Sequence, residues 1–221
     1  MEIDHCSFPE DALYDPDNFV WAKVESDKLV RVGINSIFSS LAGRLIRVSL
    51  KEININITKG RSLGTIESGR YFGVVRSPVT GSIVEINDAV VSNPKLVNDS
   101  PYTDGWVSVI MNENLSLEIK HLDTIQSCHD ILRSQIKQLH TRCFVAFPDH
   151  EMFEIGVECS STLAKLDDLI KRVNIGDVIH IVSDDVTADL EMMRWSELRS
   201  QPILEIRQEN SLFHILVKKS S

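Results

Sequence analysis

The sequence has little of what a nucleic-acid-binding or membrane-bound protein needs. It carries 23 lysines and arginines against 32 aspartates and glutamates, a formal charge of −9, whereas nucleic acids and anionic membranes attract basic surfaces. It contains no run near the roughly 20 consecutive apolar residues of a membrane span. The first residues lack the basic and apolar segments of a signal peptide. We therefore expect no nucleic-acid partner, no membrane partner and a cytoplasmic location.

Cysteine is also scarce. The four cysteines, Cys6, Cys128, Cys143 and Cys159, form no Cys-x-x-Cys pair, so their spacing predicts neither a zinc site nor a disulfide framework. This usage is typical of a reducing compartment, in which a cysteine usually serves as a small buried apolar residue. Phosphate-loop, Gly-x-Ser-x-Gly and His-Glu-x-x-His motifs are missing too. With no acid/base pair around a nucleophile, the sequence predicts a protein that is not an enzyme and holds no metal.

The hydrophobic period changes at about residue 120, and we place a domain boundary at about residue 140. Before it, period-two runs predict strands at 29–34 and 45–50, and Asn35 and Gly43 are placed to begin and end a short helix between them. Apolar residues at helical spacing predict an amphipathic helix over 122–139. Beyond it, the pattern predicts, in order, an extended run near 151–158, a helix near 161–173, a strand at 177–183, a helix near 187–199, and strands at 202–208 and 211–218.

Six blocks between residues 14 and 138 occur in the order and spacing of a known family. They are Trp21, Val32-Gly33-Ile34, and residues 64–68, 77–81, 93–98 and 101–106. Together they resemble the H protein of the glycine cleavage system. The resemblance implies a lipoyl-type β-sandwich (a barrel-sandwich hybrid) with a C-terminal helix. In that family, a lysine at the tip of a hairpin carries lipoic acid, and the arm shuttles an aminomethyl group between partner enzymes.

Arginine stands where this family carries its lipoyl-lysine. Arg70 follows Glu67-Ser68-Gly69 at the predicted tip, and no lysine occurs between Gly60 and Pro94. Lipoylation forms an amide and needs a neutral amine. A guanidinium group stays protonated and its lone pairs are delocalised, so it is not an acceptor. We therefore expect no cofactor, lipoate included.

The same hairpin supplies the candidate partner-binding residues, which are Glu67, Arg70, Tyr71 and Phe72. Arg70 either grips an anion or a carboxylate through its planar fork or is a solvated loop residue. Tyr71 and Phe72 either form a small exposed apolar patch or fold back onto the sheet.

Residues 151–220 resemble the TusA family of small sulfur carriers. The resemblance implies two helices on a four-stranded sheet and a cysteine, at the start of the first helix, that accepts sulfur as a persulfide. Here the family's Cys-Pro-x-Pro reads Cys159-Ser160-Ser161-Thr162. The helix dipole and free backbone N–H groups would lower the pKa of the Cys159 thiol, which makes Cys159 the candidate catalytic residue, as a persulfide acceptor. The alternative is a cysteine that is merely retained or packed.

The sequence thus predicts a two-domain α+β protein. An H-protein-like lipoyl-type domain at 1–138 and a linker at 139–150 precede a TusA-like domain at 151–221, a two-layer α/β sandwich with a four-stranded mixed sheet and two helices. One hypothesis is a non-lipoylated carrier or docking protein of lipoyl or sulfur metabolism, with a persulfide on Cys159. The others are a non-catalytic protein that docks partners of the glycine cleavage system, and an H protein lipoylated elsewhere, for instance at Lys59. The expected partners are proteins of lipoyl, glycine cleavage or sulfur-transfer pathways.

Overall fold

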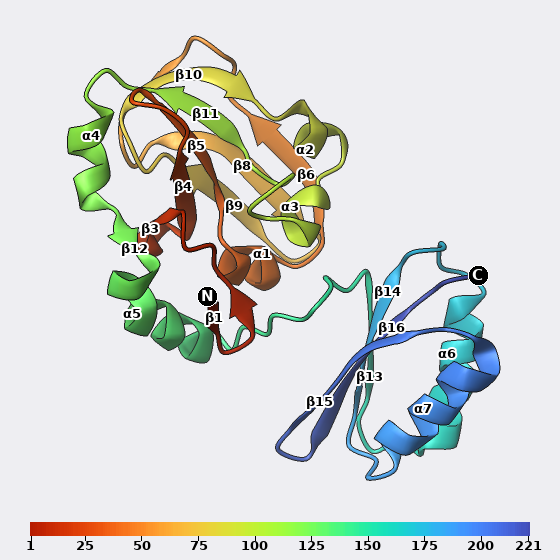
Figure 1. The fold of residues 1–221 in the computed structure, drawn as a ribbon. Helices are drawn as coiled ribbons and strands as arrows, with labels where there is room; N and C mark the ends of the chain where they lie inside the picture. Colours follow the sequence, from red (N-terminus) through yellow and green to blue (C-terminus); the bar gives the residue numbers. More distant parts are fainter. The chain divides into compact units, whose positions relative to one another are not determined.

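The computed structural model describes residues 1–221, which form two compact units, Met1–Cys143 and Phe144–Ser221 (Figure 1). The division falls within the segment 139–150 that the sequence analysis assigns to a linker. None of the helices combines the length and the apolar character needed to cross a membrane. Each unit has its own hydrophobic core and is described by itself below.

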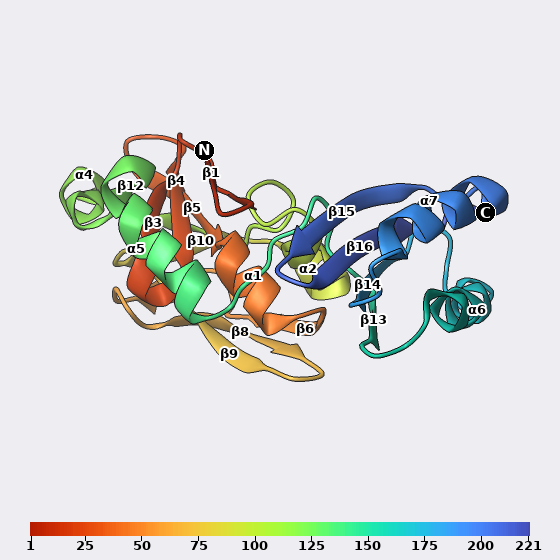
Figure 2. The same ribbon diagram turned by 90° about the horizontal axis from the view of Figure 1, so that it is seen from below.

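The first unit is built on two antiparallel sheets that face each other across a buried core (Figures 1 and 2). In spatial order the larger sheet contains β12 (Asp123–Thr124), β3 (Leu13–Asp15), β4 (Val20–Val24), β5 (Leu29–Ile34), β11 (Ser108–Met111), β10 (Gly81–Ile86) and β7 (Asn56–Ile57). The smaller sheet contains β6 (Leu45–Leu50), β8 (Ser62–Ser68) and β9 (Phe72–Arg76). Val20 and Ile34 of the larger sheet share one core cluster with Ile66 and Val75 of the smaller, so the two sheets form a β-sandwich.

Helices close the sandwich at its ends. They are α1 (Ser36–Ala42), α2 (Asp88–Ser92), α3 (Leu96–Asp99), α4 (Leu115–Glu118) and α5 (Ile125–Gln138), with 3-10 turns η1 (Pro16–Asn18) and η2 (Ile119–His121). Asn35 caps α1, because its side-chain oxygen accepts from Phe38 N at 3.1 Å, and Gly43 ends that helix as predicted. Thr124 caps α5 in the same way through Ser127 N.

A disulfide joins Cys6 to Cys143, whose Cα atoms lie 5.0 Å apart. Cys6 is in the small N-terminal hairpin of β1 (Glu2–Ile3) and β2 (Cys6–Ser7), which packs in one core cluster with α5. The expectation that no cysteine pairs was wrong. The two partners are 137 residues apart in the sequence, so local spacing carries no sign of the pair and only the fold brings them together.

The second unit is a four-stranded mixed sheet with two helices on one face (Figures 1 and 2). The sheet order is β13 (His150–Glu154), β14 (Val178–Ser183), β16 (Leu212–Lys218) and β15 (Ile203–Glu209), and the helices are α6 (Cys159–Ile170) and α7 (Ala188–Arg199). The pair β13–β14 is parallel, with α6 in the connection, and the other pairs are antiparallel. Alternation along β14 sends Ile179 and Ile181 toward the helices and His180 to the opposite face.

Candidate functional site

The hairpin that joins β8 to β9 is fastened to the end of α1. Ser68 Oγ donates to the carbonyl of Ala42 at 2.6 Å and accepts from the backbone N–H groups of Arg70 and Tyr71 at 3.2 and 3.1 Å. One buried hydroxyl therefore shapes the turn and docks it on the helix. This is the Ser68 of the block 64–68 that the sequence analysis singled out.

Arg70 folds back onto Gly43, the residue that ends α1. A Cβ atom placed on Gly43 would stand 2.8 Å from Arg70 Nε, so the guanidinium lies directly over the glycine. The carbonyl of Gly43 is itself held at 3.0 Å by the side-chain amide of buried Asn98. The carbonyl end of a helix is its negative pole. The cation at the tip is thus placed against α1, although its side chain remains largely exposed.

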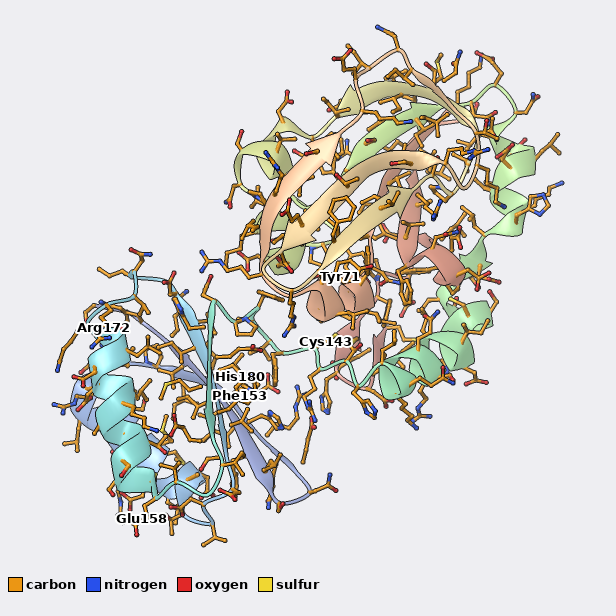
Figure 3. The ribbon with its side chains drawn as sticks, turned by 180° about the vertical axis from the view of Figure 1, so that it is seen from behind. Tyr71, Cys143, Phe153, Glu158, Arg172 and His180 are labelled. Carbon is orange, nitrogen blue, oxygen red and sulfur yellow. A yellow bond between two sulfur atoms is a disulfide. The ribbon has the colours of Figure 1, made fainter.

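The two aromatic residues of the tip separate into one packed and one exposed side chain. Tyr71, labelled in Figure 3, packs edge-on against Phe38 with ring centroids 5.4 Å apart. Phe72 is 66% exposed. The sequence left two possibilities for these side chains, an exposed apolar patch or packing onto the sheet. Tyr71 packs onto the core, and Phe72 points to solvent.

Phe72 belongs to an outward-facing surface of the smaller sheet, which we call the tip patch and define as Ile46, Arg47, Glu67 and Phe72. Glu67 is the strand partner of both Arg47 and Phe72, so these three form one row across the sheet. Arg47 Nη1 lies 3.9 Å from Glu67 Oε2. Ile46, at a bulge in β6, is 62% exposed. Two apolar side chains and one pair of opposite charges make up the patch.

Lys59 lies at the far end of the same strand. It occupies the exposed turn before β8, where its backbone N–H donates to Thr80 Oγ1 at 3.2 Å. The tip follows the last residue of β8, so the length of that strand, about 20 Å at ~3.3 Å per residue, separates Lys59 from Arg70. The two positions do not form one site.

Cys159 is the first residue of α6, which begins two residues before the helix expected near 161–173. The surroundings of its thiol oppose a thiolate. Its backbone N–H donates to Asp185 Oδ2 at 2.8 Å, and its side chain is buried. Burial raises the pKa of the Cys159 thiol to about 11, and the charges of Asp185 and Glu191 add to the rise. The expected lowering of this pKa was wrong. The two carboxylates come from the segment after β14 and from α7, so the sequence around the cysteine does not reveal them.

Two buried histidines were missed by sequence reasoning. His180 of β14 and His214 of β16 stack with their ring centroids 5.2 Å apart, and His180 Nε2 lies 2.9 Å from His214 Nδ1. Phe144 covers both rings, at 4.6 Å from His180 and 6.1 Å from His214. His180 is labelled in Figure 3. Strand alternation puts both histidines on the sheet face opposite the helices, which is the only signal that the sequence carries.

The β-sandwich with a hairpin fastened beside α1 and a closing helix α5 is the architecture of a lipoyl-type carrier domain. A family model described as "Glycine cleavage H-protein" matches residues 13–135. The chain therefore belongs to the glycine cleavage H-protein family. That match ends before the second unit begins at Phe144.

Individual relatives agree with this assignment. Glycine cleavage system H protein 5 of Aquifex aeolicus is 36% identical over 146 residues, which are 64% of this chain and 98% of that protein. Probable glycine cleavage system H protein 2 of Sulfurisphaera tokodaii is 36% identical over 143 residues, covering 64% and 96%. A glycine cleavage system H protein from Mycobacterium marinum superposes with a TM-score of 0.50 at 27% identity, over 59% of this chain and 98% of that one. The lipoyl-type fold predicted for the first unit is confirmed.

Proposed function

We propose that the first unit is an H-protein-like docking module that carries no lipoyl group. Arg70 carries the proposal, because it occupies the hairpin tip and its guanidinium is not acylated under the conditions in which lysine is. Its packing over Gly43 also distinguishes it from an extended arm. Lys59, the alternative acceptor, is at the opposite end of β8.

The tip patch is the surface that we propose binds partners. Phe72 and Ile46 expose apolar area beside the Arg47–Glu67 pair, and protein interfaces commonly place aromatic anchors among polar groups. Arg70 and Tyr71 lie in the adjacent turn and hold it against α1 through Gly43 and Phe38. The proposed partners are enzymes that handle lipoyl carriers or the glycine cleavage reaction, because this chain keeps the fold of their carrier without its acceptor lysine.

The absence of lipoylation is tested by incubation with lipoate ligase, lipoate and ATP, followed by intact mass measurement. We expect no gain in mass for the natural chain. Arg70→Lys is the matched variant, and it should gain one lipoyl group if the hairpin is otherwise recognised. A lipoyl group on the natural chain would overturn the proposal. Its location on Lys59 would establish instead an H protein modified at a non-standard lysine.

Docking is tested by pull-down with purified lipoate ligase and glycine cleavage enzymes. Phe72→Ala should lose most of the bound partner, whereas Val84→Ala, an exposed apolar change on β10 of the other sheet, should retain it. Equal recovery by both variants would remove the tip patch as the docking surface. Recovery of none of these enzymes by the natural chain would refute the docking function itself.

A persulfide carrier at Cys159 is the second candidate, supported by the position of this cysteine as the first residue of α6. In the required step the Cys159 thiolate attacks the outer sulfur of a cysteine desulfurase persulfide, and the enzyme's own thiolate leaves. The raised thiol pKa works against that attack. After incubation with the desulfurase and cysteine, a persulfide carrier gains the mass of one sulfur atom, and Cys159→Ser does not. No gain by the natural chain would reject this role.

A further inference from the structure

We propose that the Cys6–Cys143 disulfide is a thiol-controlled latch that sets the length of the tether between the two units. Cys143 is the last residue of the first unit and Phe144 is the first residue of the second. The two neighbours are anchored by unrelated contacts, one in each unit. The inference concerns regulation and does not depend on the docking function proposed above.

Cys143 is anchored to the first unit. Its disulfide partner Cys6 is fully buried in β2, within the core cluster that also contains α5. Cys143 Sγ also lies 3.6 Å from Ser40 Oγ of α1. The chain between the end of α5 at Gln138 and Cys143 is therefore closed at both of its ends.

Phe144 is anchored to the second unit. Its ring covers His180 and His214. The guanidinium carbon of Arg207, a residue of β15, lies 5.0 Å from the centroid of the Phe144 ring. The next residue continues this attachment, since Val145 N donates to Glu205 Oε2 at 3.0 Å. With the disulfide closed, no residue remains between the two anchors, and the tether has no free length.

Reduction would change that length. A protein or small-molecule dithiol reduces the bond, so the cystine gains two electrons and two protons, the sulfurs become the thiols of Cys6 and Cys143, and the reductant becomes a disulfide. Residues 139–143 then connect α5 to Phe144 with no covalent tie. The backbone N–H groups of Leu139 and Thr141 still donate to the carbonyls of Gln135 and Ile136 at 2.9 and 3.0 Å. The five residues would span up to about 17 Å if these bonds also opened. The β1–β2 hairpin has only two residues in each strand, and so short a hairpin is marginal alone. Its local opening gives a reductant access to the buried bond.

The other cysteines, Cys128 and Cys159, are free thiols. In a reducing compartment, a disulfide in such a chain is usually transient or redox-sensing. Nothing else in the segment 139–143 ties it covalently. The redox potential around the protein would then decide whether the tether has no free length or the length of the residues that reduction releases.

Limited trypsin digestion of the full chain tests the latch, because Arg142 is exposed and lies inside the tether. Peptide mass mapping should show cleavage after Arg142 at least about tenfold faster with dithiothreitol than without it, since local opening governs such cleavage. Cys6→Ser should be cleaved at the fast rate without reductant and gain nothing from it. Cys128→Ser, which keeps the disulfide, should behave as the natural chain.

A thiol titration and the cleavage rate at two reference sites complete the test. Without reductant, denatured protein should titrate two free thiols, and four would show that the bond does not form and overturn the proposal. Cleavage after Arg31 and Lys95, inside the first unit, provides the reference. If reduction raises cleavage after Arg31 and Lys95 as much as after Arg142, the disulfide stabilises the whole first unit, and the latch is refuted. Unchanged cleavage after Arg142 refutes it as well.

Discussion

The guanidinium of Arg70 lies over Gly43, with Nε 2.8 Å from where a Cβ of that residue would stand. The two residues come from different elements, the tip of the β8–β9 hairpin and the end of α1. Gly43 also has φ +76 and ψ −173, a region that is essentially restricted to glycine. Because Gly43 has no side chain, it can adopt the backbone conformation that ends α1 and leave room for the guanidinium of Arg70.

Gly43→Ala should destabilise the first unit by about 1–3 kcal/mol, because the backbone strain at this φ and the clash with Arg70 act together. Denaturant unfolding measures the loss. Gly69→Ala, in the same hairpin, meets no atom within 4 Å and has no positive φ, so it should change the unfolding free energy by less than ~0.5 kcal/mol. Equal effects of the two substitutions would contradict the role assigned to Gly43.

The neighbouring aromatic residues of the tip should respond in opposite ways. Tyr71→Ala removes an edge-on contact with Phe38 and part of a core cluster, and should cost about 2–3 kcal/mol of unfolding free energy. Phe72→Ala should cost less than ~0.5 kcal/mol, because that ring is largely exposed. Denaturant titration of both variants gives the comparison. A large loss for Phe72→Ala would mean that its ring is packed and is not available to a partner.

The sequence predicts what depends on near neighbours. The expected strands at 29–34 and 45–50 coincide with β5 and β6, and the helix expected over 122–139 is α5, shortened at its start because Thr124 caps it. The period of apolar residues predicts all three elements, and a local cap determines where α5 begins. In the second unit the strands expected at 177–183, 202–208 and 211–218 lie within one residue of β14, β15 and β16.

The features that define the candidate sites depend on distant residues instead. Arg70 and Gly43 are 27 positions apart, the two histidines are 34 apart, and the disulfide joins residues 137 apart. The pKa of Cys159 was expected to fall because the helix start is visible in the sequence. It rises because burial and the Asp185 carboxylate are properties of the folded state.

Asp185→Asn should lower the pKa of Cys159, because it removes the larger of the two charges that raise it, while an amide oxygen still accepts from the Cys159 N–H. Thiolate absorbance against pH measures this in a Cys128→Ser background, since burial also raises the pKa of the Cys128 thiol to about 11. The natural Cys159 should titrate near 11 and the variant clearly below it. A titration that does not move would show that the Asp185 charge does not contribute to the raised pKa.

The raised pKa of Cys159 also determines how the free energy of unfolding changes with pH. The pKa of the Cys159 thiol is about 11 in the folded state, against an ordinary value of 9.0, so the thiol binds its proton more tightly in the folded state. Its contribution is fully present below pH 9 and is lost as the pH rises through 11. Cys159→Ser should therefore flatten the fall in unfolding free energy between these two pH values. An identical pH profile for the variant would show that the cysteine is not shielded from water.

Phe144→Ala should strip the cover from the histidine pair and release the second anchor of the tether. The half-buried ring contacts His180, His214 and Arg207, so its loss should cost the second unit about 2–4 kcal/mol. Denaturant unfolding followed by the fluorescence of Trp195, which is buried in that unit, measures the loss in a Trp21→Phe, Trp106→Phe background. Val145→Ala is the matched control, because its exposed side chain should contribute little while its backbone bond to Glu205 remains. If the two substitutions cost the same, Phe144 does not anchor the second unit, and the tether begins further along the chain.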